Sequence, residues 1–305
     1  MLSTTPIEVP DFLLKTARQY STSRMAIAGA DHDVALDSAL SSQEAGLIEP
    51  VLIGNKKTIE ALLTTRGLET TAYTIIHAAS ETQSAETAVQ LASNGEVAAL
   101  MKGQVHTDTL LRAVLNKDFG LRTDTRLSHI FHMTIPGDEK SLLISDAAIN
   151  VAPDIKTHLH IARNAVSLAH GLGNKCPKVA LLSASESVLD AMPSSGQAAE
   201  VARLAQAEIR DAEFGGPFAF DNAISPKAAA LKNITHPVAG NADILIVPNI
   251  ETGNALFKMM VYFMSACAAG IVMGAKVPIV LTSRADPPEA RLAAAAIAAI
   301  VSGNG

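Results

Sequence analysis

The segment TSRADPPEARL, close to the C-terminus, combines residue types that can do chemistry on an anion. It contains Ser283, Arg284 and Asp286, followed by two prolines. Arginine binds phosphate through a planar fork of donors, a serine hydroxyl can donate to a developing oxyanion, and a nearby carboxylate can take a proton from a thiol or a water. Because proline is favoured at the first helical position, we expect Asp286 to cap a helix start, which attracts anions. A surface ion pair of Arg284 with Asp286 or Glu289 is the alternative.

A second polar turn lies in the N-terminal half, within MKGQVHTDTLLRAVL. Lys102 and His106 flank a glycine-bearing turn, and Thr107 lies in the first turn of the helix that we expect to follow. Arg112 would lie about one helical turn further along, at roughly 3.6 residues per turn. Basic side chains around one helix start favour an anion pocket. A purely structural role for His106, taken alone, stays open.

Other motifs for phosphate, metal or covalent chemistry are absent from the sequence. There is no GxxxxGK[ST], no GxGxxG and no GxSxG. The histidines do not cluster at ligand spacing and HExxH is absent, so we expect no metal site. Neither Cys176 nor Cys267 has neighbours that would activate a thiol, which argues against a cysteine nucleophile.

The composition fits a globular enzyme with a large core. The chain has 305 residues, of which 48% are hydrophobic, and a formal net charge of -6. It therefore allows one large or two medium domains, and it excludes disorder and a disulfide scaffold. The acidic balance argues against a nucleic-acid partner. The longest uncharged run is shorter than the ~20 residues of a membrane-spanning helix, and no secretory signal is present. We expect a cytoplasmic protein with no membrane partner.

Short apolar runs alternate with longer amphipathic stretches, which predicts an α/β fold with parallel strands covered by helices on both faces. Ligands then bind beyond the carboxyl ends of the strands, where polar runs such as Asp31-His32-Asp33 lie. The expected strands span 25–30, 50–54, 71–78, 97–103, 141–149, 178–184, 218–225, 242–250 and 277–283. The expected helices span 84–93, 107–116, 154–169, 196–212, 254–269 and 287–301.

One segment breaks this alternation. Residues 129–149 have the pattern of two strands joined by Pro-Gly-Asp, which predicts a β-hairpin. An antiparallel insertion halfway along the chain suggests a switch from one sheet to another. We therefore expect a domain boundary near residue 137.

Several separated blocks resemble the phosphate acetyltransferase / phosphate butyryltransferase family, in the right order from about residue 95 to 295, and closest to its butyryltransferase-like branch. The blocks are MKGQVHTDTLLRAVL with RLSHIFHM, GPFAFDNAIS, GNADILIVPNIETGNALFK and GIVMGAKVPIVLTSRAD. The resemblance implies reversible transfer of an acetyl or butyryl group between acyl-CoA plus phosphate and acyl phosphate plus CoA. The family transfers the acyl group directly in a ternary complex. CoA is then a substrate, no cofactor or metal takes part, and the enzyme is a homo-oligomer, a dimer or larger.

The resemblance also implies a fold. Members are similar to isocitrate and isopropylmalate dehydrogenases, with two three-layer α/β/α domains, an interdomain cleft and a final segment that returns to the first domain. On this basis the first domain comprises 1–137 plus 280–305, and the second comprises 138–279.

The family's catalytic pair matches Ser283 and Arg284, which would steady the transition state. In the acetyltransferases the acid that deprotonates the CoA thiol lies further into the following helix, where this chain has Ala290. We assign that role to Asp286, with Glu289 as the alternative.

The resemblance extends to the residues that bind the substrates. His106, Thr107 and Arg112 match the block that lines the phosphate side, and Asn254 and Lys258 match the TGN…K block. Phosphate and CoA are anions, so this acidic chain needs a local basic pocket. The candidates for that pocket are Lys102, Arg112, Arg126 and Arg284.

Two other functions remain open at this point. A decarboxylating dehydrogenase on the same fold would need a divalent metal and several converging carboxylates. A protein that binds CoA or acyl phosphate without turning it over would fit the missing acid at position 290. The preferred acyl chain length does not follow from the sequence.

Overall fold

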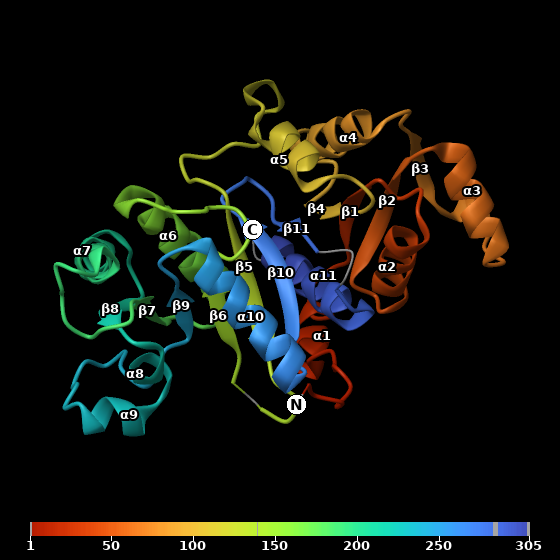
Figure 1. Ribbon diagram of the computed structural model, residues 1–305. Helices are drawn as coiled ribbons and strands as arrows, with labels where there is room; N and C mark the ends of the chain where they lie inside the picture. The colour runs from red at the N-terminus through yellow and green to blue at the C-terminus, as the bar shows by residue number, and fades with distance from the viewer. Residues whose placement is uncertain (1, 139, 283–285, 304–305) are drawn as a thin grey trace. The chain divides into compact units, whose positions relative to one another are not determined.

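The structure is a computed structural model that describes residues 2–138, 140–282 and 286–303 (Figure 1). It divides into two compact units. Unit 1 comprises Met1–Glu8 and Thr125–Ala268, and unit 2 comprises Val9–Asp124 and Ala269–Gly305.

Unit 2 is built on a mainly parallel set of strands. Neighbouring strands follow the order β3-β2-β1-β4-β11-β10, and only β10 runs antiparallel to its neighbour β11. The strands are β1 (Ser23–Ala28), β2 (Ile48–Gly54), β3 (Thr74–His77), β4 (Ala99–Lys102), β10 (Cys267–Met273) and β11 (Ile279–Val280). The helices are α1 (Asp11–Ala17), α2 (Asp33–Glu44), α3 (Lys56–Thr65), α4 (Glu81–Ser93), α5 (Thr107–Leu115) and α11 (Pro288–Gly303), with short 3-10 turns at Thr70–Ala72 and Lys117–Phe119.

Unit 1 has a parallel set of strands with one antiparallel hairpin. The order is β5-β6-β9-β7-β8, and β5 runs antiparallel to β6. The strands are β5 (Ser128–Thr134), β6 (Leu142–Ser145), β7 (Lys178–Leu182), β8 (Glu213–Phe218) and β9 (Ile244–Ile246). The helices are α6 (Ile155–Gly171), α7 (Pro193–Glu208), α8 (Phe220–Ile224), α9 (Pro226–Leu231) and α10 (Ile250–Met264).

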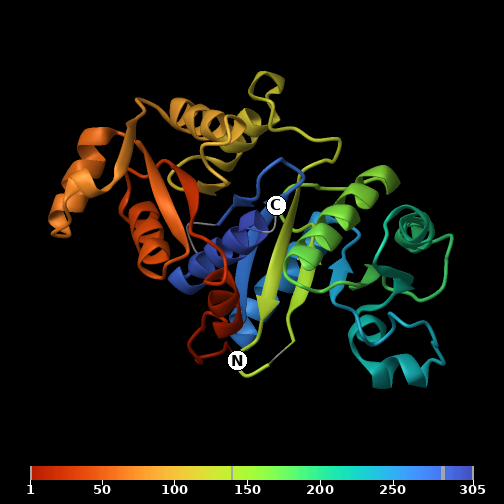
Figure 2. The same cartoon turned by 180° about the vertical axis from the view of Figure 1, so that it is seen from behind.

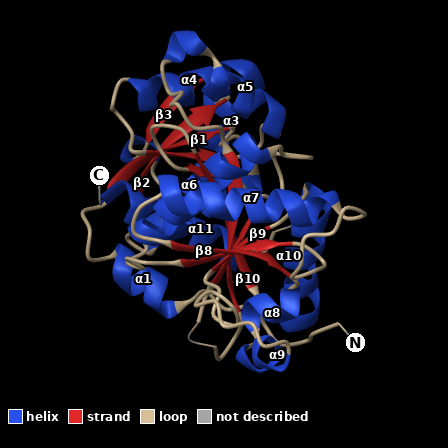
Figure 3. Cartoon of the chain, turned by 90° about the vertical axis from the view of Figure 1, so that its left-hand side faces the viewer, coloured by secondary structure: helices blue, strands red, loops and turns tan. Residues whose placement is uncertain are grey.

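Helices cover both faces of the unit 1 strands. Helix α10 lies in front of β5 and β6 in Figure 1, and α6 lies in front of them in the opposite view of Figure 2. Figure 3 shows α6 and α7 together on one side of the strands. Burial on both faces explains the uninterrupted apolar strand sequences, and the predicted α/β class is confirmed.

The hairpin predicted from Pro-Gly-Asp is confirmed. Strands β5 and β6 pair antiparallel, with Ile130 opposite Ser145. Both strands belong to unit 1, and the chain passes between the two compact units at 8–9, 124–125 and 268–269. The domain boundary near residue 137 stays a prediction from the sequence.

Two predicted elements are wrong. The strand expected over 218–225 ends at Phe218 and is followed by helix α8, and the strand itself starts earlier, in a glycine-rich stretch with weak strand propensity. The helix expected over 254–269 ends at Met264, because Ser265 adopts a left-handed backbone (φ 51°), and strand β10 follows. An apolar run has the same composition in a buried helix and a buried strand, so periodicity alone could not separate them.

Candidate active site

The first candidate site lies where the strand order of unit 2 reverses. From β1 the chain goes to β2 and β3 on one side and then returns to β4 on the other side. In open α/β sheets, ligands bind at such a switch point, beyond the carboxyl ends of the strands.

Two glycines let the ends of β1 and β4 approach each other. The N–H of Gly103 donates to the carbonyl of Ala28, and the N–H of Gln104 donates to that of Gly29, both at 2.8 Å. A Cβ on Gly29 would lie 2.9 Å from backbone atoms of Gln104, and one on Gly103 would meet the backbone oxygen of Gly29. No larger residue fits either position without moving backbone.

A pocket of about 190 Å³ opens at this switch point. Its walls come from the segment after β1, the turn after β4 and the end of β11, together with one side chain of α11. We call it the switch-point pocket. It is lined by His32, Val34, Ala35, Ser38, Met101, Lys102, Gly103, Gln104, Val280, Thr282 and Arg291.

Of the predicted site residues, Lys102 lies in this pocket. Its ammonium donates to the carbonyls of Gly103 and Val105, at 3.3 Å each, which holds the charge over the turn. Thr282 directly precedes Ser283 and Arg284, the predicted catalytic pair, which lies outside the described residues.

Of the predicted cluster of Lys102, His106 and Arg112, the lysine and the arginine line two different hollows among the described residues. His106 is exposed, and Nδ1 of its ring lies 2.7 Å from a carboxylate oxygen of Glu81. Arg112 lies further along α5, which begins at Thr107 as expected, and lines a separate open groove. That groove also contains the carboxylates of Glu86 and Asp108, which oppose the binding of an anion there.

The acids near the catalytic pair lie at the start of α11. The carbonyl of Pro287 accepts the N–H groups of Ala290 and Arg291, so the helix begins at Pro288. Asp286 and Glu289 are both half-buried. Ala290, the position at which the resemblance implies an acid, is only 1% exposed and is an apolar contact of the core.

The other predicted residues belong to unit 1. Asn254 lies in the first turns of α10, where its Nδ2 donates to the carbonyl of Ala147 at 3.5 Å. A Cβ on Gly253 would lie 2.6 Å from the carbonyl oxygen of Asp146, so glycine is required for this approach. Lys258 is exposed further along the helix, with Nζ 5.9 Å from the centroid of the Phe257 ring.

A buried carboxylate shapes the loop that contacts α10. Asp146, only 2% exposed, accepts the backbone N–H groups of Ala148 and Ile149 at 2.9 and 3.0 Å. It also accepts the side-chain amide of Asn150 at 2.6 Å. The carboxylate therefore fixes the loop whose Ala147 carbonyl receives Asn254.

Arg126 precedes β5, and its backbone is hydrogen-bonded to a side chain of α6. Its backbone carbonyl accepts Nδ2 of Asn164 at 2.8 Å. Hydrogen bonds from Thr157 lower the pKa of Asp154, the N-cap of α6, and the positive charge of Arg126 contributes to the lowering.

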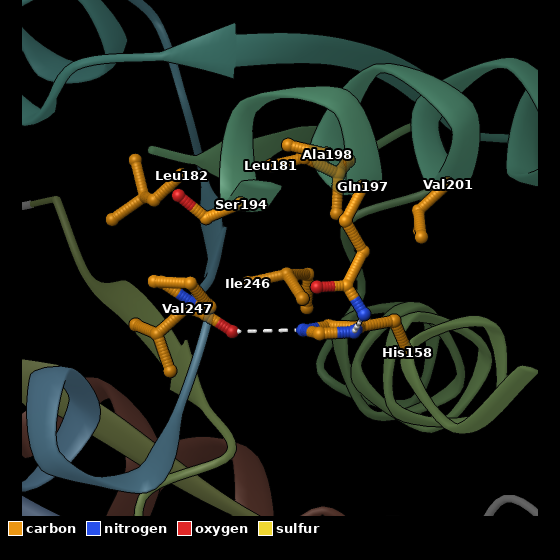
Figure 4. A pocket seen from close by; sticks show the side chains of 10 residues that line it. His158, Leu181, Leu182, Ser194, Gln197, Ala198, Val201, Ile246 and Val247 are labelled. Atoms are coloured by element: carbon orange, nitrogen blue, oxygen red, sulfur yellow. Dashed lines mark hydrogen bonds between the residues drawn. The ribbon is translucent and has the colours of Figure 1, made fainter. Parts of the chain in front are cut away.

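A second, much smaller hollow lies among the ends of β7 and β9 in unit 1 (Figure 4). We call it the histidine hollow. His158 lies in it, with Nε2 3.1 Å from the carbonyl of Val247, to which it donates. The side chain of Gln197 donates to the carbonyl of Pro153 at 2.7 Å and lies 3.4 Å from Nδ1 of the histidine. Burial lowers the pKa of His158.

Sequence reasoning missed two basic residues of the switch-point pocket, His32 and Arg291. His32 lies in the polar run directly after the first strand, so its position was a usable signal. Arg291 lies on an alanine-rich helix and carries no local motif, and only the packing of α11 against β4 and α2 brings it to the pocket. Within the described residues, no group of three metal-ligating side chains occurs, and no helix is long and apolar enough to cross a membrane.

Comparison with known proteins identifies the family. Residues 78–299 match the family described as "Phosphate acetyl/butaryl transferase". A phosphate acetyltransferase of Rickettsia prowazekii (strain Madrid E) is 43% identical over 265 residues, 86% of this chain and 76% of the relative. A phosphate butyryltransferase of Clostridium beijerinckii (strain ATCC 51743 / NCIMB 8052) is 37% identical over 292 residues, 95% of this chain and 97% of the relative. The chain belongs to the phosphate acetyl/butyryl transferase family, and the predicted acyltransferase class is confirmed.

Solved structures support the same assignment. The structure titled a branched-chain phosphotransacylase from Enterococcus faecalis V583 has a TM-score of 0.80 and 33% identity, covering 92% of this chain and 99% of the other. A 4-hydroxythreonine-4-phosphate dehydrogenase from Burkholderia phymatum has a TM-score of 0.60 at 12% identity, over 92% of this chain and 98% of the other. At that identity the second likeness concerns the fold alone, and it agrees with the predicted kinship to dehydrogenase folds.

Proposed function

We propose that this protein transfers an acetyl or butyryl group directly between acyl-CoA and inorganic phosphate in a ternary complex. A phosphate oxygen attacks the thioester carbonyl carbon, the C–S bond breaks, and acyl phosphate and the CoA thiolate form. The thiolate then takes up a proton. In reverse, the thiol loses its proton and sulfur attacks the acyl phosphate. The observation that carries the proposal is the family match over residues 78–299.

The chain's own residues supply positioning and charge in this proposal. Ser283 and Arg284 would donate to the oxygen that becomes negative as the carbonyl is attacked. Asp286 would exchange the proton with sulfur, and Glu289 is the alternative because Ala290 cannot do so. Thr107, Arg112, Arg126, Asn254 and Lys258 remain proposed contacts of the substrates. No cofactor beyond the substrate CoA and no metal is required for this chemistry.

We also propose that the enzyme is a homo-oligomer, a dimer or larger. Four large apolar side chains near the end of α10 are 42–56% exposed, which is costly for a monomer. They are Met259, Tyr262, Phe263 and Met264. Light scattering on wild type and Phe263→Glu tests this proposal: the charge is expected to shift the mass towards the monomer, and a monomeric wild type would contradict it.

The reaction is tested by following thiol release from acetyl-, propionyl- and butyryl-CoA with phosphate. Ser283→Ala is expected to lower kcat by about 10²–10³, the effect of losing one oxyanion donor. Asp286→Asn is expected to lower kcat as well, and Glu289→Gln to leave it near wild type. Ser187→Ala and Asp190→Asn, both exposed, are matched controls.

The outcomes separate the proposals. Binding of CoA without thiol release by wild type would contradict the transferase activity and favour a non-catalytic binding protein. Full activity of Asp286→Asn would overturn only the assignment of the proton acceptor. A burst of thiol release without phosphate would indicate a covalent acyl-enzyme and contradict direct transfer.

A further inference from the structure

The switch-point pocket has the charge of an anion site. Two cationic side chains, Lys102 and Arg291, line it beside His32, and no carboxylate is among its described lining residues. The groove at Arg112 differs, because Glu86 and Asp108 line it too. The whole chain has a net charge of -6, so a concave site whose described charged residues are all basic attracts anions locally.

Helix α2 adds the field of its N-terminus. His32, Val34 and Ala35 line the pocket, and the helix of 12 residues starts between them at Asp33. Backbone N–H groups of a first turn and the helix dipole both favour a negative group at this end. The carboxylate of Asp33 is itself engaged by Arg66, whose Nη2 lies 2.8 Å from it, and this hydrogen bond lowers the pKa of Asp33.

The orientation of His32 leaves a donor for a ligand. The N–H of Val34 donates to Nδ1 of the ring at 3.4 Å, so the side chain caps α2. A ring nitrogen that accepts a hydrogen bond carries no proton, and the proton of the neutral ring is therefore on Nε2. Nε2 can donate to an oxyanion.

The size of the pocket selects a small group. About 190 Å³ equals several water molecules at roughly 30 Å³ each, which suits one phosphate group with its hydration. It is below the roughly 300 Å³ at which sites for drug-sized ligands begin, so a complete CoA does not fit inside.

We propose that the switch-point pocket binds a phosphate group, through Nε2 of His32, the guanidinium of Arg291 and the ammonium of Lys102. This inference deepens the proposed function and rests on it for the identity of the ligand, because that reaction offers two sources. One is inorganic phosphate, and the other is a phosphate of CoA whose remaining atoms lie outside the pocket.

The test measures direct binding by calorimetry, with inorganic phosphate alone and with CoA alone. The proteins are wild type, His32→Gln, Arg291→Gln and the control Arg203→Gln, whose side chain is 65% exposed and pairs with Glu200 on α7. Each pocket variant is expected to bind one of the two probes about 10-fold more weakly or worse, because a hydrogen bond to a charged group is lost. The control is expected to bind both like wild type.

The probe that responds identifies the source of the phosphate group. Weaker binding of inorganic phosphate assigns the pocket to that substrate, and weaker binding of CoA assigns it to a phosphate of CoA. If wild type binds neither probe, or both variants bind both probes like wild type, the proposal is overturned. Thiol release by wild type, measured separately, decides the proposed function, so either proposal can fail while the other stands.

Discussion

Both units have a point where the order of their parallel strands reverses, and the two points differ in what fills them. In unit 2 it lies between β1 and β4, and in unit 1 between β9 and β7. Each has a histidine nearby. The switch-point pocket measures about 190 Å³, whereas the histidine hollow measures about 10 Å³, at the lower limit for holding one water.

The side chains explain this difference. In the histidine hollow, His158 and Gln197 bond to each other and to backbone carbonyls, so the polar groups stabilise the fold of unit 1 (Figure 4). In the switch-point pocket, Nδ1 of His32 caps α2 and Lys102 donates to the carbonyls of Gly103 and Val105, while Lys102 and Arg291 also bring positive charge to its wall. The same topology thus supports a nearly filled hollow or a wider, positively charged pocket, depending on which side chains line it.

The largest effect on ligand binding is expected from closing the switch-point pocket. In Gly103→Ala, the new Cβ would lie 2.8 Å from the carbonyl oxygen of Ala28 and 3.0 Å from Cβ of Ala35. The ends of β1 and β4 must then separate, at a cost of about 1–3 kcal/mol in the free energy of unfolding. We expect binding of the responding phosphate probe to fall at least about 10-fold.

Gly196→Ala is the control for this substitution, since its Cβ would meet nothing closer than 3.7 Å, and in a helix it should stabilise by up to about 1 kcal/mol. Urea unfolding measures the free energy of unfolding, and calorimetry measures binding of the phosphate probe. A Gly103→Ala protein that keeps wild-type stability and binding would show that the close approach does not shape the pocket.

The next effect concerns the buried histidines, whose protonation is expected to destabilise the fold in acid. Burial lowers the pKa of His132 on β5 from 6.5 to about 4, so the unfolded chain binds the proton more readily than the folded one. Stability is then complete above pH 6.5 and falls as the pH drops towards 4. The difference in pKa corresponds to about 3 kcal/mol, and His158, whose pKa is also lowered, adds to the loss.

Urea unfolding between pH 7 and 4 measures this slope. His132→Asn is expected to flatten it, whatever its stability at pH 7. An unchanged slope in His132→Asn would show that this histidine is protonated in the folded protein over the same range.

A smaller effect tests whether the histidine hollow is structural. His158→Leu leaves the carbonyl of Val247 buried without its donor, at an expected cost of about 1–3 kcal/mol. His158→Gln keeps an N–H donor at a similar reach and should recover part of this loss. Binding of phosphate or CoA is expected to stay unchanged in both variants, and a binding defect in folded His158→Gln would contradict the distinction between the two hollows.

The sequence predicted best where a local signal coincided with the local structure. The Pro-Gly-Asp turn predicted the β5–β6 hairpin, and the amphipathic spacing of Leu110, Leu111 and Val114 predicted α5 within one residue. The sequence did not predict helix α2, because its serine-rich sequence has little amphipathic contrast. It also misplaced the end of α10, where Ser265 adopts a left-handed backbone although it is not a glycine.

Only part of the candidate site was predicted, because only some of its residues carry a local sequence signal. Lys102 was found because it ends a strand, and the same rule pointed to the run that contains His32, although His32 was not chosen as a site residue. The position of Arg291 depends on how α11 packs, and Arg112 lies in a groove lined by other residues of α4 and α5, away from Lys102. Such relations between elements are not encoded in any short stretch of residues.

The smallest effect concerns the stability contributed by His32. Its capping hydrogen bond is long, 3.4 Å, and exposed, so His32→Ala should cost well under the ~1 kcal/mol typical of a good N-cap. Ser80→Ala is the matched control, because the Ser80 hydroxyl caps α4 by accepting the N–H of Gln83 at 3.2 Å. Urea unfolding at pH 7 ranks the two variants against His158→Leu. If His32→Ala destabilises the protein as much as His158→Leu, then His32 is a structural histidine and the contrast between the two switch points is lost.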